Sequence, residues 1–288
     1  MDADTFSDPS VIAFSDQFAK IKINAGTDEG RPIAEQFHIE GVPQMVFING
    51  DEYEFDRIIG YLPPDGFIPR VQDILNNKNT IPDLEHRLAD EPGNREILHE
   101  LAGKYENMGK DEYAKDLYTQ LLEYYPEDTG QDINHARYFL AMSHFYDGDK
   151  TKIEAFIKNF PESSYVYDAY QNVSRYYQSL EDVENEVIVL SEFVMKFPDD
   201  SSALNSYAWR MAELQMNLDD ALIKARHAVE LLSDNPEYQA NIIDTEAEIL
   251  WRMGRNDEAV SAIEKAISID PESQYFQDQK AKFLEQNS

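Results

Sequence analysis

The spacing of apolar positions changes once along this chain. Before residue 76, apolar and polar side chains alternate at 19–24, 45–49 and 55–61, which is the period of a β-strand. The Asn-Gly-Asp sequence at 49–51 predicts a hairpin turn, and short helices are expected at 32–39 and 67–75. Beyond residue 77, apolar residues and alanines recur three and four positions apart, which predicts amphipathic helices. The pattern predicts two domains, at 1–76 and at 77–288.

Prolines punctuate the helical region at a nearly constant interval. They stand at 92, 126, 161, 198, 236 and 271, so neighbouring prolines are 34 to 38 residues apart. Each is expected to end the second helix of a pair, where it disturbs no upstream hydrogen bond. Two stretches share a set of small, apolar and turn positions: Leu98, Leu101, Ala102, Tyr105, Gly109, Ala114, Tyr118 and Pro126, and Ile243, Ala247, Leu250, Gly254, Ala259, Ile263, Ala266 and Pro271. This signature resembles the tetratricopeptide repeat (TPR), a pair of antiparallel helices. We expect a TPR array with degenerate middle repeats and a capping helix from Gln274 to Gln286.

The first domain has its own order of motifs. Asp8 and Pro9 open a short helix, and the sequence Gly-Val-Pro-Gln at 41–44 precedes a strand, a hairpin and a closing helix. This order is similar to the second half of a thioredoxin domain. The resemblance implies a cis peptide bond between Val42 and Pro43. We therefore expect an α+β, mostly α fold class: a partial thioredoxin-like α/β domain, apparently truncated at its N-terminus, followed by an α-helical TPR solenoid.

The family's first strand and its Cys-x-x-Cys motif have no counterpart here, because the chain contains no cysteine. Thiol catalysis, disulfides and thiolate metal sites are thereby excluded within the sequence as given. Two readings follow. In one, the gene model starts at an internal methionine, Met1, and the true protein carries the missing strand, the cysteines and an export signal. In the other, the region is a redox-dead remnant. The chain as given shows no signal peptide and is expected to be cytoplasmic, whereas an upstream start implies a periplasmic or exported protein.

The charge balance narrows the choice of partners. The chain carries 56 acidic and 25 basic residues, a formal net charge of −31. Nucleic acids and anionic membranes would be repelled, so neither is expected as a partner. The acidity fits either a cationic client or a solvated surface adapted to salt.

No catalytic constellation is visible in the sequence. Gly-rich phosphate loops, Gly-x-Ser-x-Gly and His-Glu-x-x-His are absent, and the six histidines form no pair at the i, i+4 spacing of helical metal ligands. We therefore expect no catalytic residue, no cofactor and no metal.

A TPR array offers a concave groove lined by the first helix of each repeat. Positions one residue off the small-residue stripe are expected to face it: His99, Tyr138, Met142, Phe145, Arg175, Trp209, Asp244, Glu248, Trp251 and Arg252. Large aromatic and arginine side chains dominate binding energies at interfaces. The alternative is that several of these rings pack between degenerate repeats.

Two classes of function follow from these patterns. The first is a non-catalytic scaffold whose groove binds a peptide or protein client. The second is a thiol–disulfide oxidoreductase in cell redox homeostasis, whose Cys-x-x-Cys segment is missing from the gene model. Because thiol exchange requires a thiolate, the chain as given favours the scaffold.

Overall fold

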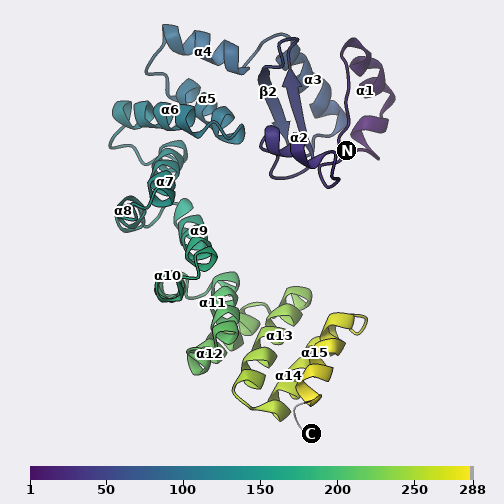
Figure 1. The fold of residues 1–288 in the computed structure, drawn as a ribbon, viewed down its shortest axis with the longest axis vertical. Coiled ribbons are helices and arrows are strands. Elements are labelled where there is room, and N and C mark those ends of the chain that lie inside the picture. Colours follow the sequence, from purple (N-terminus) through teal and green to yellow (C-terminus); the bar gives the residue numbers. More distant parts are fainter. Residues whose placement is uncertain (286–288) are drawn as a thin grey trace. The chain divides into compact units, whose positions relative to one another are not determined.

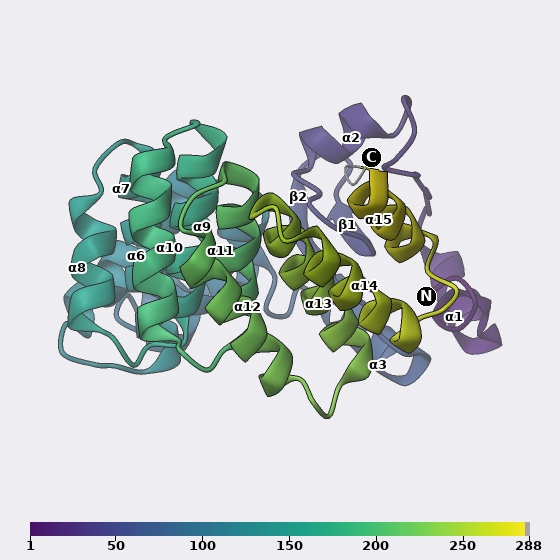
Figure 2. The same ribbon diagram turned by 90° about the horizontal axis from the view of Figure 1, so that it is seen from below.

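A computed structural model describes residues 1–285, which divide into two compact units. Unit 1 covers residues 1–166 and unit 2 begins at residue 167. Figure 1 shows the elements along the chain, and Figure 2 shows them after a turn of 90°. Gln286, the last residue of the predicted capping helix, lies outside the described residues.

Unit 1 contains a β-hairpin and eight complete helices among its described residues. In chain order these are α1 (Pro9–Phe14), α2 (Arg31–Gln36), β1 (Gln44–Ile48), β2 (Glu54–Ile59), α3 (Pro64–Leu75), α4 (Ile81–Asp90), α5 (Arg95–Asn107), α6 (Asp111–Tyr124), α7 (Gln131–Tyr146) and α8 (Thr151–Asn159). Single 3-10 turns flank α1, at Thr5–Ser7 and at Ser15–Gln17.

Unit 2 is helical throughout its described part. Its helices are α10 (Val183–Lys196), α11 (Ser201–Leu214), α12 (Leu218–Leu231), α13 (Pro236–Arg252), α14 (Asn256–Ile269) and α15 (Gln274–Glu285). Helix α9 (Tyr165–Ser179) begins two residues before the boundary between the units.

The helices form successive pairs, as the repeat period predicts. Helices α5 and α6 pack against each other, as do α7 and α8, α11 and α12, and α13 and α14. In the most degenerate pair, α9 meets α10 through the stacked rings of Tyr170 and Phe193. The fold is therefore a mostly α-helical repeat array with a small N-terminal two-stranded hairpin.

Turns between the paired helices require a residue with positive φ. Gly109, Gly148 and Gly254 supply it at φ values of 66°, 94° and 75°. The α9–α10 turn has no glycine, and Glu181 adopts φ 56° instead. Glycine enters this region of backbone space without steric cost, whereas a residue with a Cβ does not.

Five of the six periodic prolines follow the end of a second helix by two residues, but Pro236 does not. It is the first residue of α13, five positions beyond the end of α12. The expectation that Pro236 ends α12 is corrected. Proline is favoured at the first helical position because its missing N–H has no intrahelical partner there.

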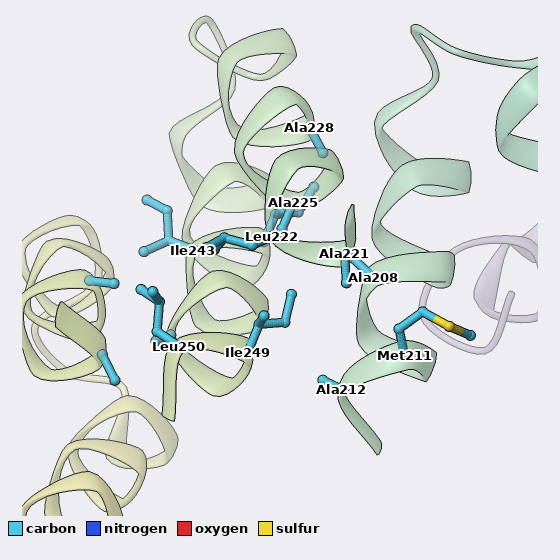
Figure 3. Packing of buried hydrophobic residues seen from close by; sticks show 14 of the residues in the cluster. Ala208, Met211, Ala212, Ala221, Leu222, Ala225, Ala228, Ile243, Ile249 and Leu250 are labelled. Carbon is cyan, nitrogen blue, oxygen red and sulfur yellow. The ribbon is translucent and has the colours of Figure 1, made fainter. Parts of the chain in front are cut away.

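Alanines allow close crossing within the pairs. The signature alanines Ala102, Ala114, Ala247 and Ala259 are completely buried, as predicted. Figure 3 shows the same principle in unit 2, where Ala208, Ala221 and Ala225 lie between α11, α12 and α13 beside larger apolar side chains. Close-packed interiors tolerate added methylenes poorly, so these positions fix the spacing of the helices.

The predicted hairpin is present, with a longer turn than a two-residue loop. β1 and β2 pair antiparallel from Gln44 opposite Ile59 to Ile48 opposite Glu54. The Asn49 side chain accepts hydrogen bonds from the backbone N–H groups of Asp51 and Tyr53, both at 3.0 Å. This cap stabilises a five-residue connection.

The strand predicted at 19–24 is wrong. These residues have no regular structure, and Ile21 and Ile23 are 83% and 42% exposed. The alternating pattern is real, but a strand forms only when its backbone pairs with a neighbour. The sheet among the described residues consists of β1 and β2 alone.

Buried ion pairs join the hairpin to the first repeat within unit 1. The Arg57 guanidinium pairs with Glu54 at 2.6 Å and donates to the backbone oxygens of Asn107 and Phe37 at 2.5 and 2.8 Å. Asp56, 1% exposed, accepts from Lys104 of α5 at 2.6 Å. The domain boundary between residues 76 and 77 stays a prediction, and these contacts cross it.

None of the helices within residues 1–285 combines the length and the hydropathy that a membrane crossing requires.

Candidate functional site

The predicted groove residues are divided between the two units. His99, Tyr138, Met142 and Phe145 lie on α5 and α7 of unit 1, and the other six lie on α9, α11 and α13. The two sets are therefore described separately.

In unit 1, His99 belongs to a cluster of rings between α5, α6 and α7. Its Nε2 lies 3.4 Å from Nδ1 of His135, and that nitrogen lies 3.2 Å from the Tyr118 hydroxyl. The Tyr118 hydroxyl donates to Glu106 at 2.7 Å. Burial and the neighbouring His135 lower the pKa of His99 from its ordinary value, so its imidazole is neutral at pH 7. The rings of this cluster pack against one another and are hydrogen-bonded, and His99 is half-buried.

The other predicted groove residues of unit 1 differ in exposure. Tyr138 is half-buried and stacks on Tyr165 with ring centroids 5.4 Å apart. Met142 and Phe145 are 6% and 2% exposed and belong to the interior. A buried side chain offers no surface to a client, so His99 and Tyr138 are the accessible members of this set.

In unit 2, the C-terminal helix α15 covers the predicted groove face of α13. Asp244 and Glu248 are each 4% exposed. Tyr275 donates to Asp244 at 2.8 Å, and Lys282 donates to Glu248 at 2.5 Å. Arg252 of α13 also pairs with Glu248, at 2.9 Å. These acidic residues serve the packing of α15.

Trp251 belongs to the same interface. Its ring lies 5.9 Å from that of Phe283, and the cationic heads of Arg252 and Lys282 lie 4.7 and 4.4 Å from its centroid. The indole Nε1 of Trp251 and the Oδ1 of Asp244 are buried without a hydrogen-bond partner among the described residues. Trp251 is therefore a packing residue of the cap, and its polar edge is unsatisfied.

The buried Asp244 makes the stability of unit 2 depend on pH. Burial, assisted by Glu248, raises its pKa to about 6, against an ordinary 3.8. The folded state therefore binds this proton more tightly than the unfolded state. The stabilisation that this proton contributes is fully present below about pH 4. It is lost as the pH rises through 6, which lowers the free energy of unfolding by on the order of 3 kcal/mol. Asp244→Asn, which keeps an acceptor for Tyr275, is expected to abolish this loss.

Urea unfolding at a series of pH values, followed by tryptophan fluorescence, measures the effect. Both tryptophans, Trp209 and Trp251, lie in unit 2, so the signal reports that unit. The exposed carboxylate of Asp234 provides a matched control as Asp234→Asn. Parallel curves for the wild type and Asp244→Asn would contradict the prediction.

Arg175 and Trp209 are the most accessible predicted groove residues of unit 2. Arg175 is exposed and Trp209 is half-buried. Next to Trp209, Arg210 forms a bidentate pair with Glu186, which is 2% exposed, at 2.7 and 2.9 Å. This pair, whose hydrogen bonds raise the pKa of Arg210, fixes α11 on α10 and orients the surface that carries Trp209.

The sequence did not predict a shallow hollow beside that surface. It lies between the first turns of α11 and α13 and includes Ser202, Asn205 and Asn241. A signal was present, because Asn205 precedes Trp209 by four residues and Asn241 precedes Asp244 by three. Those spacings place residues on one helix face.

The peptide bond between Val42 and Pro43 is cis, and Val42 is 77% exposed. Across residues 1–285, no three histidine, aspartate or glutamate side chains are grouped so that they could hold a metal ion.

Comparison with known proteins identifies the repeats. Family models described as tetratricopeptide repeat match residues 101–128 and 244–273. These segments fall on the pairs α5–α6 and α13–α14. The chain therefore contains tetratricopeptide repeats in these two segments. The comparisons give no support to the thioredoxin-like resemblance of residues 1–76.

The solved structures that match this chain include the following two. One is YrrB, described as a TPR protein with an unusual peptide-binding site, at 16% identity and a TM-score of 0.48 over 69% of this chain and 97% of that one. Another is BtubC (BKLC) from P. vanneervenii, at 19% identity and a TM-score of 0.43 over 66% of this chain and 86% of that one. A comparison with curated proteins found no match.

Proposed function

We propose that this chain is a non-catalytic scaffold whose repeat array binds a peptide or protein client. The observation that carries the proposal is the presence of tetratricopeptide repeats near both ends of the array, at 101–128 and 244–273. Stacked repeats present an extended surface for partners. The sequence contains no cysteine, so thiol chemistry contributes nothing to it.

We propose one candidate client surface in each unit, and each is smaller than the helical register alone suggests. In unit 1 it comprises His99 and Tyr138, and in unit 2 it comprises Arg175 and Trp209. Side chains buried in the interior or beneath α15 are left out. Tryptophan, tyrosine and arginine are the residue types most often responsible for interface energy.

We further propose that residues 1–76 are a redox-dead, thioredoxin-like part that anchors the first repeat of the array at 77–288. The order of α2, the β1–β2 hairpin and α3 supports this proposal, and the missing strand at 19–24 counts against it. The hydrogen bond from Arg57 to the backbone oxygen of Asn107 and the pair of Asp56 with Lys104 supply the anchoring contacts. Substitution of Arg57 tests this role.

Trp209→Ala is expected to weaken client binding by about 2 kcal/mol, close to thirtyfold, as the loss of an aromatic anchor does. A peptide selected from a displayed random library on the purified chain serves as the client, and fluorescence anisotropy measures its dissociation constant.

The matched control is Tyr113→Ala. Tyr113 is 61% exposed but lies on α6, the second helix of its pair, outside the predicted groove. Binding that responds equally to both substitutions, or to neither, would place the client elsewhere.

A further inference from the structure

The turn of the β1–β2 hairpin contains the only Asn-Gly pair of the sequence, Asn49 and Gly50, and both residues are exposed. The Asn49 carboxamide caps the turn, because its Oδ1 accepts the backbone N–H groups of Asp51 and Tyr53, each at 3.0 Å. The hydrogen bond from Asp51 closes a ring of atoms that contains both Cγ of Asn49 and the backbone nitrogen of Gly50. The cap therefore keeps a carboxamide carbon close to a backbone nitrogen.

The Gly50 nitrogen is available for reaction. Its N–H donates to no acceptor within residues 1–285, so water reaches it. A methyl group on the Gly50 Cα would have no heavy atom within 4 Å outside the two neighbouring residues, so this part of the turn is uncrowded. Glycine also leaves the backbone free to rotate toward the preceding side chain. Two groups held together in this way react faster than the same groups in free solution.

The two hydrogen bonds of the cap favour attack on the carboxamide. When a nitrogen adds to Cγ of Asn49, negative charge develops on Oδ1. Two backbone N–H groups are already directed at this oxygen, at 3.0 Å. Donors placed in advance around an oxygen that becomes negatively charged stabilise the transition state.

We propose that Asn49 is a site of spontaneous covalent modification. The Gly50 nitrogen loses its proton to hydroxide and forms a bond to Cγ of Asn49. The bond from Cγ to Nδ2 breaks, and Nδ2 takes a proton from water and leaves as ammonia. A second water then opens the cyclic imide at either carbonyl, which gives aspartate or isoaspartate with no change of oxidation state. This chemistry is independent of the scaffold function proposed above.

Isoaspartate at this position changes the hairpin. Its main chain runs through the former side chain, which adds one carbon between residues 49 and 50 and removes the acceptor that caps the turn. Strand β2, which follows the turn, carries Arg57 and Asp56, whose contacts join the hairpin to the region of α5. The modification therefore loosens β1 from β2 and weakens the attachment of the hairpin to the first repeat.

Incubation of the full chain in mildly alkaline buffer, followed by peptide mass spectrometry, tests the proposal. The peptide that contains Asn49 should gain the mass of an amide-to-acid conversion and yield an isoaspartyl form. Asn94 is the internal control, because its Oδ1 also accepts a backbone N–H, from Ile97 at 3.1 Å, but Arg95 follows it in place of a glycine. Asn94 should stay unmodified over the same time. An intact Asn49, or equal conversion at the two asparagines, would overturn the proposal.

Gly50→Ala separates the role of the glycine from that of the turn. Gly50 has no positive φ and its Cα is uncrowded, so an alanine fits the folded hairpin. Conversion at Asn49 should slow at least about tenfold, because the methyl group hinders the approach of the nitrogen. The wild-type chain unfolded in urea should convert no faster than the folded chain. Faster conversion in urea would show that the turn protects Asn49, which contradicts the proposal.

Hydrogen exchange on peptides covering 44–59 measures the structural consequence. After incubation, the wild type should exchange faster in this segment than incubated Gly50→Ala, whereas the two fresh proteins should exchange alike. Equal exchange after full conversion of Asn49 would overturn the inference that the modification loosens the hairpin.

Discussion

Replacing Arg57 with methionine is expected to lower the stability of the hairpin region by about 3–5 kcal/mol, the usual effect of removing one partner of a buried ion pair. The side chains of Arg57 and Glu54 are only 4% and 7% exposed. Without the guanidinium, the Glu54 carboxylate remains buried and unpaired. The backbone oxygens of Asn107 and Phe37 lose their donor as well.

Hydrogen exchange of the full chain, read by mass spectrometry on peptides covering 44–59, measures this effect. Arg87→Met is the matched control, because Arg87 is 46% exposed and its pair with Asp83 is expected to contribute less than about 1 kcal/mol. The double substitution Glu54→Leu with Arg57→Met should recover most of the loss, since no unpaired buried charge remains. Equal protection in Arg57→Met and Arg87→Met would show that the ion pair does not hold the hairpin.

Phe283→Ala is expected to destabilise unit 2 by about 3–5 kcal/mol, as large core truncations do. Phe283 is completely buried and packs beside Trp251. Its loss leaves a cavity under α15 and weakens the cover over Asp244 and Glu248. The fluorescence of Trp251 should therefore change together with the unfolding midpoint.

The neighbouring residue supplies the control. Leu284 is 48% exposed, so Leu284→Ala is expected to change stability by only about 0.5 kcal/mol. Urea unfolding by tryptophan fluorescence compares the two variants. The same unfolding midpoint for the two variants would show that α15 is not an integral part of unit 2.

The repeat array was predictable because its determinants are local. Proline spacing, buried alanines such as Ala102 and Ala247, and turn glycines such as Gly109 each act within about 35 residues of sequence. Helical register also predicted that Asp244 and Glu248 share one face of α13. Helical register does not show which element packs over a helix face, and α15 packs over this face of α13.

The failures of prediction concern contacts made at a distance. The alternation at 19–24 indicated a strand, although the strand that would pair with it in the resemblance has no counterpart in this sequence. Met142 and Phe145 were expected in the groove, yet the degenerate repeat draws both into its interior. The hollow at Asn205 was not predicted because the shape of a surface is a property of the packed structure.

The inward placement of cations has a consequence for how copies of the chain behave toward one another. Lys104, Arg57 and Arg210 each pair with a buried carboxylate, so these pairs remove as much negative as positive charge from the surface. The surface therefore keeps the whole acidic excess of the chain, a net charge of −31, and like-charged molecules repel at low ionic strength. A two-stranded hairpin has open edges, which are templates for association between chains. Mutual repulsion thus opposes pairing of the hairpin strands between copies of the chain, and added salt weakens that repulsion.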